Sequence, residues 1–452
     1  MCLCGNTIKM QIDMTAGKPG KLILTFIKPI IAGNIFQQLY SMADAVIVGR
    51  CLGAEALAAV GSTGNITGMM LGFLLGFTTG LTMYGTQKFG AKDWQGVKKS
   101  AGNGIVIALL VTLLGTAISV GLIDKILQWI HTPSDIYGLS RDYLLVMCCG
   151  FLFMVAYNMC ASLLRSVGNS KTPLFFLVIS SVLNVGMDIV FIAVFHWGVI
   201  GAAAATVLSQ GISAGLCMIY IIKYVPVLHL TKESLRWDWN IISKQLSIGI
   251  PMALQYSITA MGCIILQSVL NRLGSTAIAA YTAAVKIECL ATQPYPALGV
   301  TMAAYAAQNK GNNDTERIRM GVRKGVQYCL IYSAAALVLV NLLLPYLLPM
   351  FISGQQVHEA LSYAKTFTWI DSICYLPLGC IFLFREGLQG SGHALFPMLG
   401  GVVELVCRIV ISLIASVHLS FALVCIANAG TWVITAAYII IVYCAYVKKG
   451  KL

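Results

Sequence analysis

Four polar residues lie inside long apolar runs, where lipid disfavours them: Asp44, Asn184, Asp188 and Thr206. A carboxylate at the centre of a membrane span costs about 2.5–3.5 kcal/mol on insertion scales, so a retained one indicates a function. Asn184 and Asp188 are four residues apart and share one face of a helix. Sodium takes oxygen ligands, and a proton takes a carboxylate whose surroundings disfavour the charged form. The four residues therefore predict a pocket for Na⁺ or H⁺.

A second, weaker set is assigned to a substrate cavity: Gln37, Glu288 and Asp371. Gln37 lies two turns before Asp44 and either faces the same cavity or only bonds a neighbouring helix. Lys286 and Glu288 are two residues apart and therefore point to different faces, so each needs its own partner or cavity. Asp371 is the weaker C-lobe candidate, because its position in the tenth span could bring it close enough to the outer surface to be hydrated.

Each of these residues also has a purely structural interpretation. A buried carboxylate such as Asp44 or Asp188 can simply bond a neighbouring helix, and the Thr206 hydroxyl can bond its own helix. Glu404 and Arg408 are four residues apart with the acid first, which favours an intrahelical ion pair. For that pair, a structural role is the prediction.

The composition identifies the solvent of these residues as lipid. Of 452 residues, 58% are hydrophobic and 10% are charged, against about 25% charged in ordinary soluble domains; the mean hydropathy is +0.81. The net charge of +13 does not indicate nucleic acid, because the basic residues are scattered between apolar runs and form no patch. The chain is predicted to be an all-α integral membrane protein.

Apolar runs of about 20 residues or more, each long enough to cross a hydrocarbon core of about 30 Å, recur along the chain. They predict about twelve transmembrane helices, over 22–49, 56–86, 99–123, 138–164, 173–195, 198–222, 245–271, 276–304, 321–348, 360–388, 394–418 and 421–446. Pro294 and Pro296 are expected to interrupt the eighth of these. The expected domains are an N-lobe over 1–223 with a cytoplasmic N-terminal tail, an interlobe loop over 224–244 and a C-lobe over 245–452 with a short tail.

Lysine and arginine indicate the orientation, because basic residues near span ends stay in the cytoplasm. With a cytoplasmic N-terminus and twelve spans, only five basic residues fall outside: Arg50, Lys125, Arg141, Arg272 and Lys365. One missed span would place every later loop on the opposite side and mix the cytoplasmic basic residues with these five. Both termini are therefore predicted to be cytoplasmic.

The two halves are related in sequence. Gly53–Ile66 aligns without a gap with Gly274–Ile287, and Tyr84–Asp93 aligns with Tyr305–Asp314 at the same offset. Six spans separate the copies, so the halves are parallel repeats about an axis along the membrane normal. Paired bundles of this kind move around a central site in transporters.

Several segments resemble multidrug and toxic compound extrusion (MATE) transporters. The first span carries Pro29, Gln37 and LYSMADAVIVGRCLG; LRSVGNSKTPLF (Leu164–Phe175), NVGMD (Asn184–Asp188) and VIGAAAATVLSQ (Val199–Gln210) follow in family order. The DinF-like branch is the most similar. The resemblance implies two pseudo-symmetric six-helix lobes in a V, with the cation site of the N-lobe formed by the four residues that match here, Asp44, Asn184, Asp188 and Thr206.

The resemblance also implies a function. The expected protein is a prokaryotic inner-membrane antiporter that exports amphipathic, cationic drugs or metabolites in exchange for Na⁺ or H⁺, by alternating access. It would act as a monomer in contact with membrane lipid, with a small-molecule substrate, no nucleic acid and no cofactor.

Other classes of function compete with this one. A lipid-linked saccharide flippase shares the paired-bundle plan, but the four-residue set favours a MATE transporter. An intramembrane enzyme is disfavoured because the histidines all fall in or beside predicted loops, and the chain has no GxxxxGK[ST] motif for ATP.

Overall fold

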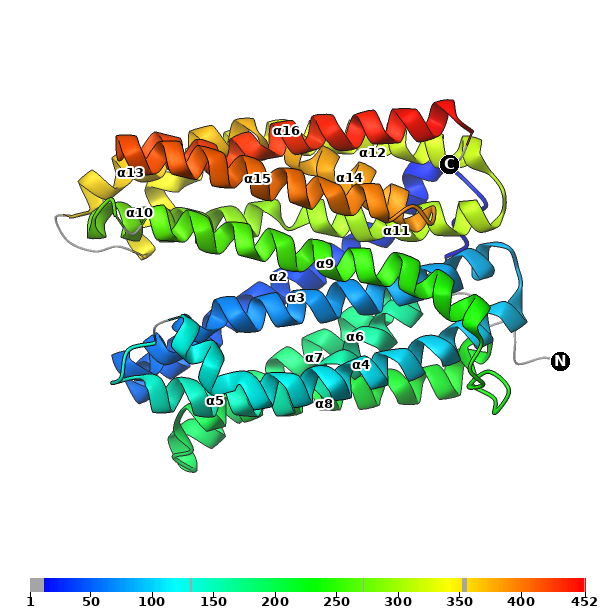
Figure 1. The fold of residues 1–452 in the computed structure, drawn as a ribbon, viewed down its shortest axis with the longest axis horizontal. Helices are drawn as coiled ribbons and strands as arrows, with labels where there is room; N and C mark the ends of the chain where they lie inside the picture. Colours follow the sequence, from blue (N-terminus) through cyan, green and yellow to red (C-terminus); the bar gives the residue numbers. More distant parts are fainter. Residues whose placement is uncertain (1–11, 131, 271, 352–355, 451) are drawn as a thin grey trace. The chain divides into compact units, whose positions relative to one another are not determined.

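The computed structural model describes residues 12–130, 132–270, 272–351, 356–450 and 452. Within these ranges the regular structure is helical (Figure 1). The α-helices are α2 (Pro19–Leu52), α3 (Ala54–Gly90), α4 (Trp94–Trp129), α5 (Tyr137–Cys149), α6 (Phe151–Ser166), α7 (Lys171–Asp188), α8 (Gly198–Tyr224), α9 (Trp239–Leu270), α10 (Ser275–Thr292), α11 (Pro294–Gly311), α12 (Thr315–Leu347), α13 (Gln356–Ile373), α14 (Tyr375–Gly390), α15 (Leu395–His418) and α16 (Phe421–Lys448). A π-helix, η2 (Ile189–Val194), extends α7, and two short 3₁₀ segments are η3 (Pro226–Leu228) and η4 (Leu348–Met350).

Nine helices of the described chain are long and apolar enough to cross a membrane, and up to eleven spans result if each of two bent pairs counts as one. The pairs are α5 with α6, bent by 45°, and α13 with α14, bent by 44°. The predicted eighth span corresponds to α10 and α11, which are not among these spans. Its helix is interrupted at Gln293, directly before Pro294, as predicted. The full count of twelve stays a prediction.

The chain forms two compact units, and α2 and α9 each contribute residues to both. The first unit contains Lys28–Ala253 and the second contains Met14–Ile27 and Leu254–Leu452. In the first unit, a core of buried apolar side chains joins α3, α4, α5, α6, α7 and α8. In the second, a core joins α9, α10, α12, α13, α15 and α16. The domain limits derived from the sequence stay a prediction.

The internal repeat begins each time with a glycine in the left-handed region of backbone conformation. Gly53, before α3, has φ of 87°, and Gly274, before α10, has φ of 96°. A side chain is strained at such angles, whereas glycine is not. The glycine shared by the two copies therefore has a backbone reason.

The repeat ends each time with an aspartate that caps the next helix. Asp93 Oδ1 accepts from the Gly96 backbone N–H at 2.8 Å before α4, and Asp314 Oδ1 accepts from the Arg317 N–H at 2.9 Å before α12. Aspartate is among the preferred N-cap residues because it satisfies a free N–H of the first turn. Hydrogen bonds from Lys88 and from the Gly96 backbone hold the pKa of Asp93 below its usual value.

Candidate functional site

The first unit brings α7 and α8 together around two of its buried polar side chains. Asn184 and Asp188 on α7 are both 0% exposed. The Asn184 amide Nδ2 donates to the Thr206 Oγ1 of α8 at 3.4 Å. Asp188 is the last residue of α7, and the wider π-helical turn η2 follows it at once. Such π-helical turns are frequent at functional sites.

Asp44 on α2 completes this group. Its carboxyl group and that of Asp188 approach within hydrogen-bonding reach of each other. Both Asp188 oxygens, Asp44 Oδ1 and Asn184 Oδ1 find no hydrogen-bond donor among the described residues. Ionised carboxylates only accept hydrogen bonds, so these two groups can hydrogen-bond to each other only when one of them is protonated. The structure thus brings together all four residues of the predicted cation set.

Tyr40 borders the pair, Gln210 contacts Tyr40, and neither residue was predicted. The Tyr40 side chain of α2 is hydrogen-bonded with Gln37 and with Gln210 of α8, and it lies close enough to Asp44 for electrostatic interaction. Their signal is helical spacing: Tyr40 lies four residues before Asp44, and Gln210 lies four after Thr206. Gln37 itself is exposed, and its side chain contacts Tyr40.

The second unit contains another buried carboxyl pair, Asp371 on α13 and Glu288 on α10. They are 0% and 6% exposed, and their carboxyl groups are within hydrogen-bonding reach of each other. Asn428 of α16 donates from Nδ2 to Asp371 Oδ2 at 2.7 Å. Packing of α10 and α16 on α13 buries the Asp371 side chain, so it is not exposed at a surface of this unit. Lys286 is exposed and Glu288 buried, which confirms that they point to different faces.

The predicted ion pair on α15 is confirmed. Arg408 Nη2 lies 2.9 Å from Glu404 Oε1, and both side chains are almost fully buried. The guanidinium also contacts two other helices, which the sequence did not indicate: Nη2 approaches Asn428 Oδ1 at 3.4 Å, and Nη1 approaches the Cys263 sulfur at 3.7 Å. Arg408 thus links α15 with α9 and α16.

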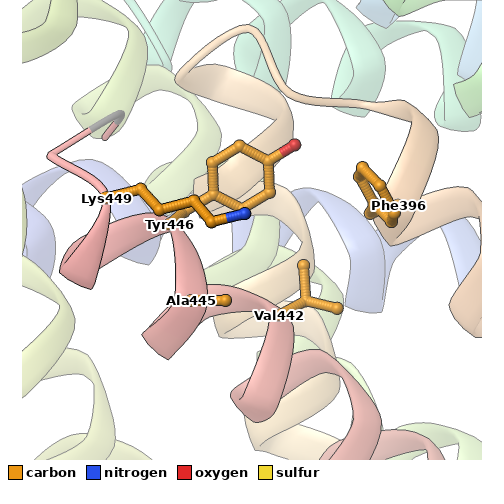
Figure 2. A pocket seen from close by; sticks show the side chains of 5 residues that line it. All are labelled: Phe396, Val442, Ala445, Tyr446 and Lys449. Carbon is orange, nitrogen blue, oxygen red and sulfur yellow. The ribbon is translucent and has the colours of Figure 1, made fainter.

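A separate cavity of about 260 Å³ lies beside α16 and contains none of the predicted site residues. Its lining is Phe396, Val442, Ala445, Tyr446 and Lys449. Figure 2 shows these side chains: three come from the last turns of α16, and Lys449 directly follows that helix. Within the described residues, no group of three or more His, Cys, Asp or Glu side chains is placed to hold a metal ion. The candidate functional groups are the two buried carboxyl pairs and their amide neighbours.

Comparison with known proteins identifies the family. The MatE family model matches residues 29–190 and 251–414, which include α2 from Pro29 onward, all of α7, and most of α15. This chain belongs to the MatE family. As a family member with many spans, it is a multi-pass membrane protein. The DinF-like branch stays a prediction.

Curated relatives of this MatE protein match along most of its length. It is 29% identical over 390 residues to a probable multidrug resistance protein, YpnP, of Bacillus subtilis, with 85% of each chain covered. It is 23% identical over 394 residues to a probable multidrug resistance protein, NorM, of Thermotoga maritima, with 84% of this chain and 82% of the relative covered.

Solved structures share its fold. An outward-facing multidrug resistance MATE transporter of the MOP superfamily matches with a TM-score of 0.90 at 20% identity, covering 96% of this chain and 97% of the other. A MOP superfamily transporter from Pyrococcus furiosus matches with the same score, identity and coverage. The predicted all-α membrane fold of MATE type is confirmed.

Proposed function

We propose that this MatE protein is a secondary active efflux transporter. It exports amphipathic, cationic small molecules by antiport with Na⁺ or H⁺, through alternating access of two lobes. It lies in a prokaryotic inner membrane with both termini in the cytoplasm and acts as a monomer, without a cofactor or a catalytic residue. The names of the relatives support export, since YpnP and NorM are both described as probable multidrug resistance proteins.

The observation that carries the proposal is the carboxyl pair of the first unit. Two buried carboxylates within hydrogen-bonding reach repel each other strongly. They therefore do not both stay ionised without a cation between them. Asp44 and Asp188 have no ion-pair partner among the described residues. A single proton or cation from solution relieves this repulsion, and in the proposed mechanism it is bound and released once per transport cycle.

The neighbours of the pair suit either ion. A proton needs only the two carboxyl groups, one of which then donates to the other. A sodium ion needs further oxygen ligands, and Asn184 Oδ1, which has no donor, and the Thr206 hydroxyl supply them. The same four residues therefore serve both versions of the proposal.

The pair also suggests how ion and substrate communicate. Asp44 comes from α2 and Asp188 from α7, so an ion between them draws two helices together. An antiporter requires that occupancy by the ion disfavours occupancy by the substrate, which is a reciprocal coupling. Closure of α2 on α7 is the movement that we assign to this coupling.

Transport in proteoliposomes tests the proposal. Purified protein is reconstituted, and uptake of the fluorescent amphipathic cation ethidium against its gradient is driven by a sodium gradient or a pH gradient imposed separately. The wild type is expected to respond to at least one of them. Asp188→Asn keeps the side-chain shape but removes the charge that the ion neutralises, so uphill transport is expected to fall to background.

Asp124→Asn is the matched control. Asp124 is an exposed acid of the same unit, paired with Arg141 at 2.9 Å, and exposed pairs contribute little to stability. This variant should transport like the wild type. Asp188→Asn that folds normally and transports uphill at the wild-type rate would show that the proposed cation site is wrong. Equal transport without any ion gradient would rule out antiport.

A further inference from the structure

The Asn428 side chain lies between a group that only donates hydrogen bonds and a group that accepts them. Its Oδ1 faces Arg408 Nη2 at 3.4 Å, and its Nδ2 donates to Asp371 Oδ2 at 2.7 Å. A guanidinium has no acceptor, and an ionised carboxylate has no donor. Hydrogen-bond partners are the basis for assigning amide orientation, and this environment admits only one orientation with both partners satisfied.

Arg408 is itself held in place by a second contact. Its Nη2 donates to Glu404 Oε1 at 2.9 Å, one turn earlier on α15, and the two side chains are 3% and 6% exposed. A guanidinium can donate in several fixed directions and stays charged in a buried site. Glu404 therefore fixes Arg408, and Arg408 fixes the amide of Asn428.

The oriented amide distinguishes the two members of the carboxyl pair. Asp371 receives the Asn428 hydrogen bond, whereas Glu288 Oε1 has no partner among the described residues. The two carboxyl groups can hydrogen-bond to each other only when one is protonated. A hydrogen bond to a carboxylate and a nearby cation both favour its charged form. The charge therefore belongs on Asp371 and the proton on Glu288.

Other titratable groups also face Asp371, and they do not reverse this order. They come from α10, α14, α15 and α16 and from the junction of α13 with α14: Tyr281, Glu288, Cys374, Tyr375, Arg408 and Cys425. Arg408 is the cation among them. The cysteines and tyrosines are neutral near pH 7 in their ordinary state.

We propose that Arg408 and Asn428 are positioning residues that place the single negative charge of this carboxyl pair on Asp371 and its proton on Glu288. Arg408 acts through the Asn428 amide. With Glu404 and Arg408 neutralising each other, the cluster keeps one uncompensated charge at a fixed atom. This inference goes beyond the proposed export function, and it holds or fails independently of transport.

The two units differ in a way that makes the proton observable. The pair of the first unit consists of two aspartates, whereas the pair of the second unit consists of a glutamate and an aspartate. Infrared spectra of protein labelled with ¹³C in the side-chain carboxyl of glutamate, or of aspartate, therefore separate the protonated carboxyl bands. The protein is purified in detergent near pH 7 without sodium.

The wild type is expected to show a protonated glutamate band that Glu288→Gln removes. Glu386, a buried glutamate beside Arg385 in the same unit, provides the control: Glu386→Gln should leave that band in place. Asn428→Leu removes the amide, and most of the band should move from the glutamate label to the aspartate label, because Asp371 loses the hydrogen bond that keeps it charged.

Arg408 is tested with its partner replaced too, so that no buried charge is left alone. Glu404→Gln combined with Arg408→Gln should move the band as Asn428→Leu does, and adding both changes to Asn428→Leu should cause no further movement, since coupled groups are not additive. The proposal is overturned if the wild-type proton resides on Asp371 or on neither residue. It is also overturned if the Glu404 and Arg408 changes leave the band unmoved, or move it further when Asn428 is already absent.

Discussion

Each unit buries a carboxyl pair, but the surroundings of the two pairs differ. Asp44 and Asp188 are bordered by an amide, hydroxyls and Tyr40, and they take part in no ion pair of the described residues. Asp371 and Glu288 lie one amide away from Arg408. A pair without an internal cation depends on an ion from solution. In the second unit, Arg408 and Asn428 favour the ionised form of Asp371. We therefore expect ion exchange in the first unit and a fixed charge in the second.

Neutralising an acid should affect the stability of the two units in opposite ways. Glu404→Gln leaves Arg408 buried without its ion-pair partner and is expected to destabilise the protein by about 3–5 kcal/mol. Asp188→Asn removes the repulsion between two acids and should leave stability unchanged or raise it. Thermal unfolding in detergent, without sodium, measures both. A larger loss in Asp188→Asn than in Glu404→Gln would contradict the comparison.

The ion dependence of substrate affinity should belong to the first unit. Typical coupling between two sites is about 1–3 kcal/mol, and Asp44→Asn is expected to abolish most of it, because the ion can no longer join α2 to α7. Asp371→Asn should change which cationic substrates bind, while their affinity should still depend on the coupling ion. Ethidium titrations in detergent at several sodium concentrations and pH values measure the effect. Ion dependence that survives in Asp44→Asn and disappears in Asp371→Asn would place the coupling in the second unit.

Removal of the aspartate caps that end the repeat should give the smallest loss of stability. The loss should be equal in both units. Asp93→Ala and Asp314→Ala are each expected to cost about 0.5–2 kcal/mol, the usual value of an N-cap. The pKa of Asp93 is below its usual value in the folded protein. Its contribution is therefore present at neutral pH and is lost as the pH falls through that lowered pKa. Thermal unfolding between pH 7 and acid conditions checks this, and a cap contribution that grows on acidification would contradict it.

The predicted cation set depended on features that a sequence shows directly. A carboxylate inside an apolar run is costly, and the spacing of Asn184 and Asp188 places them on one helical face. The approach of Asp44 to Asp188 joins segments far apart in the chain, and the resemblance, not the spacing, pointed to it. Spacing alone could have added Tyr40 and Gln210.

In the second unit, the contacts of Asn428 with Arg408 and Asp371 could not be predicted in this way. Asn428 is neutral, and an asparagine inside an apolar run carries a weaker signal than a carboxylate. It lies 57 residues from Asp371, so no helical spacing relates them. The role of Asn428 follows only from the packing of α13, α15 and α16.

Helix limits were predicted where apolar runs end, but the breaks inside spans were mostly missed. The predicted span over 138–164 is divided at Gly150, where a Cβ would collide with Val207 of α8. The predicted span over 360–388 is divided at Cys374, three residues before Pro377, whose nitrogen cannot bond the preceding turn. Both breaks follow from local packing and backbone chemistry that hydropathy does not register.

The most direct test of the central claim measures what the substrate displaces. Purified protein in weakly buffered detergent solution is titrated with ethidium, and the release of protons, or of bound ²²Na⁺, is recorded for the wild type, Asp188→Asn and Asp371→Asn. The account predicts ion release from the wild type and from Asp371→Asn, and none from Asp188→Asn. Release that persists in Asp188→Asn and disappears in Asp371→Asn would contradict it.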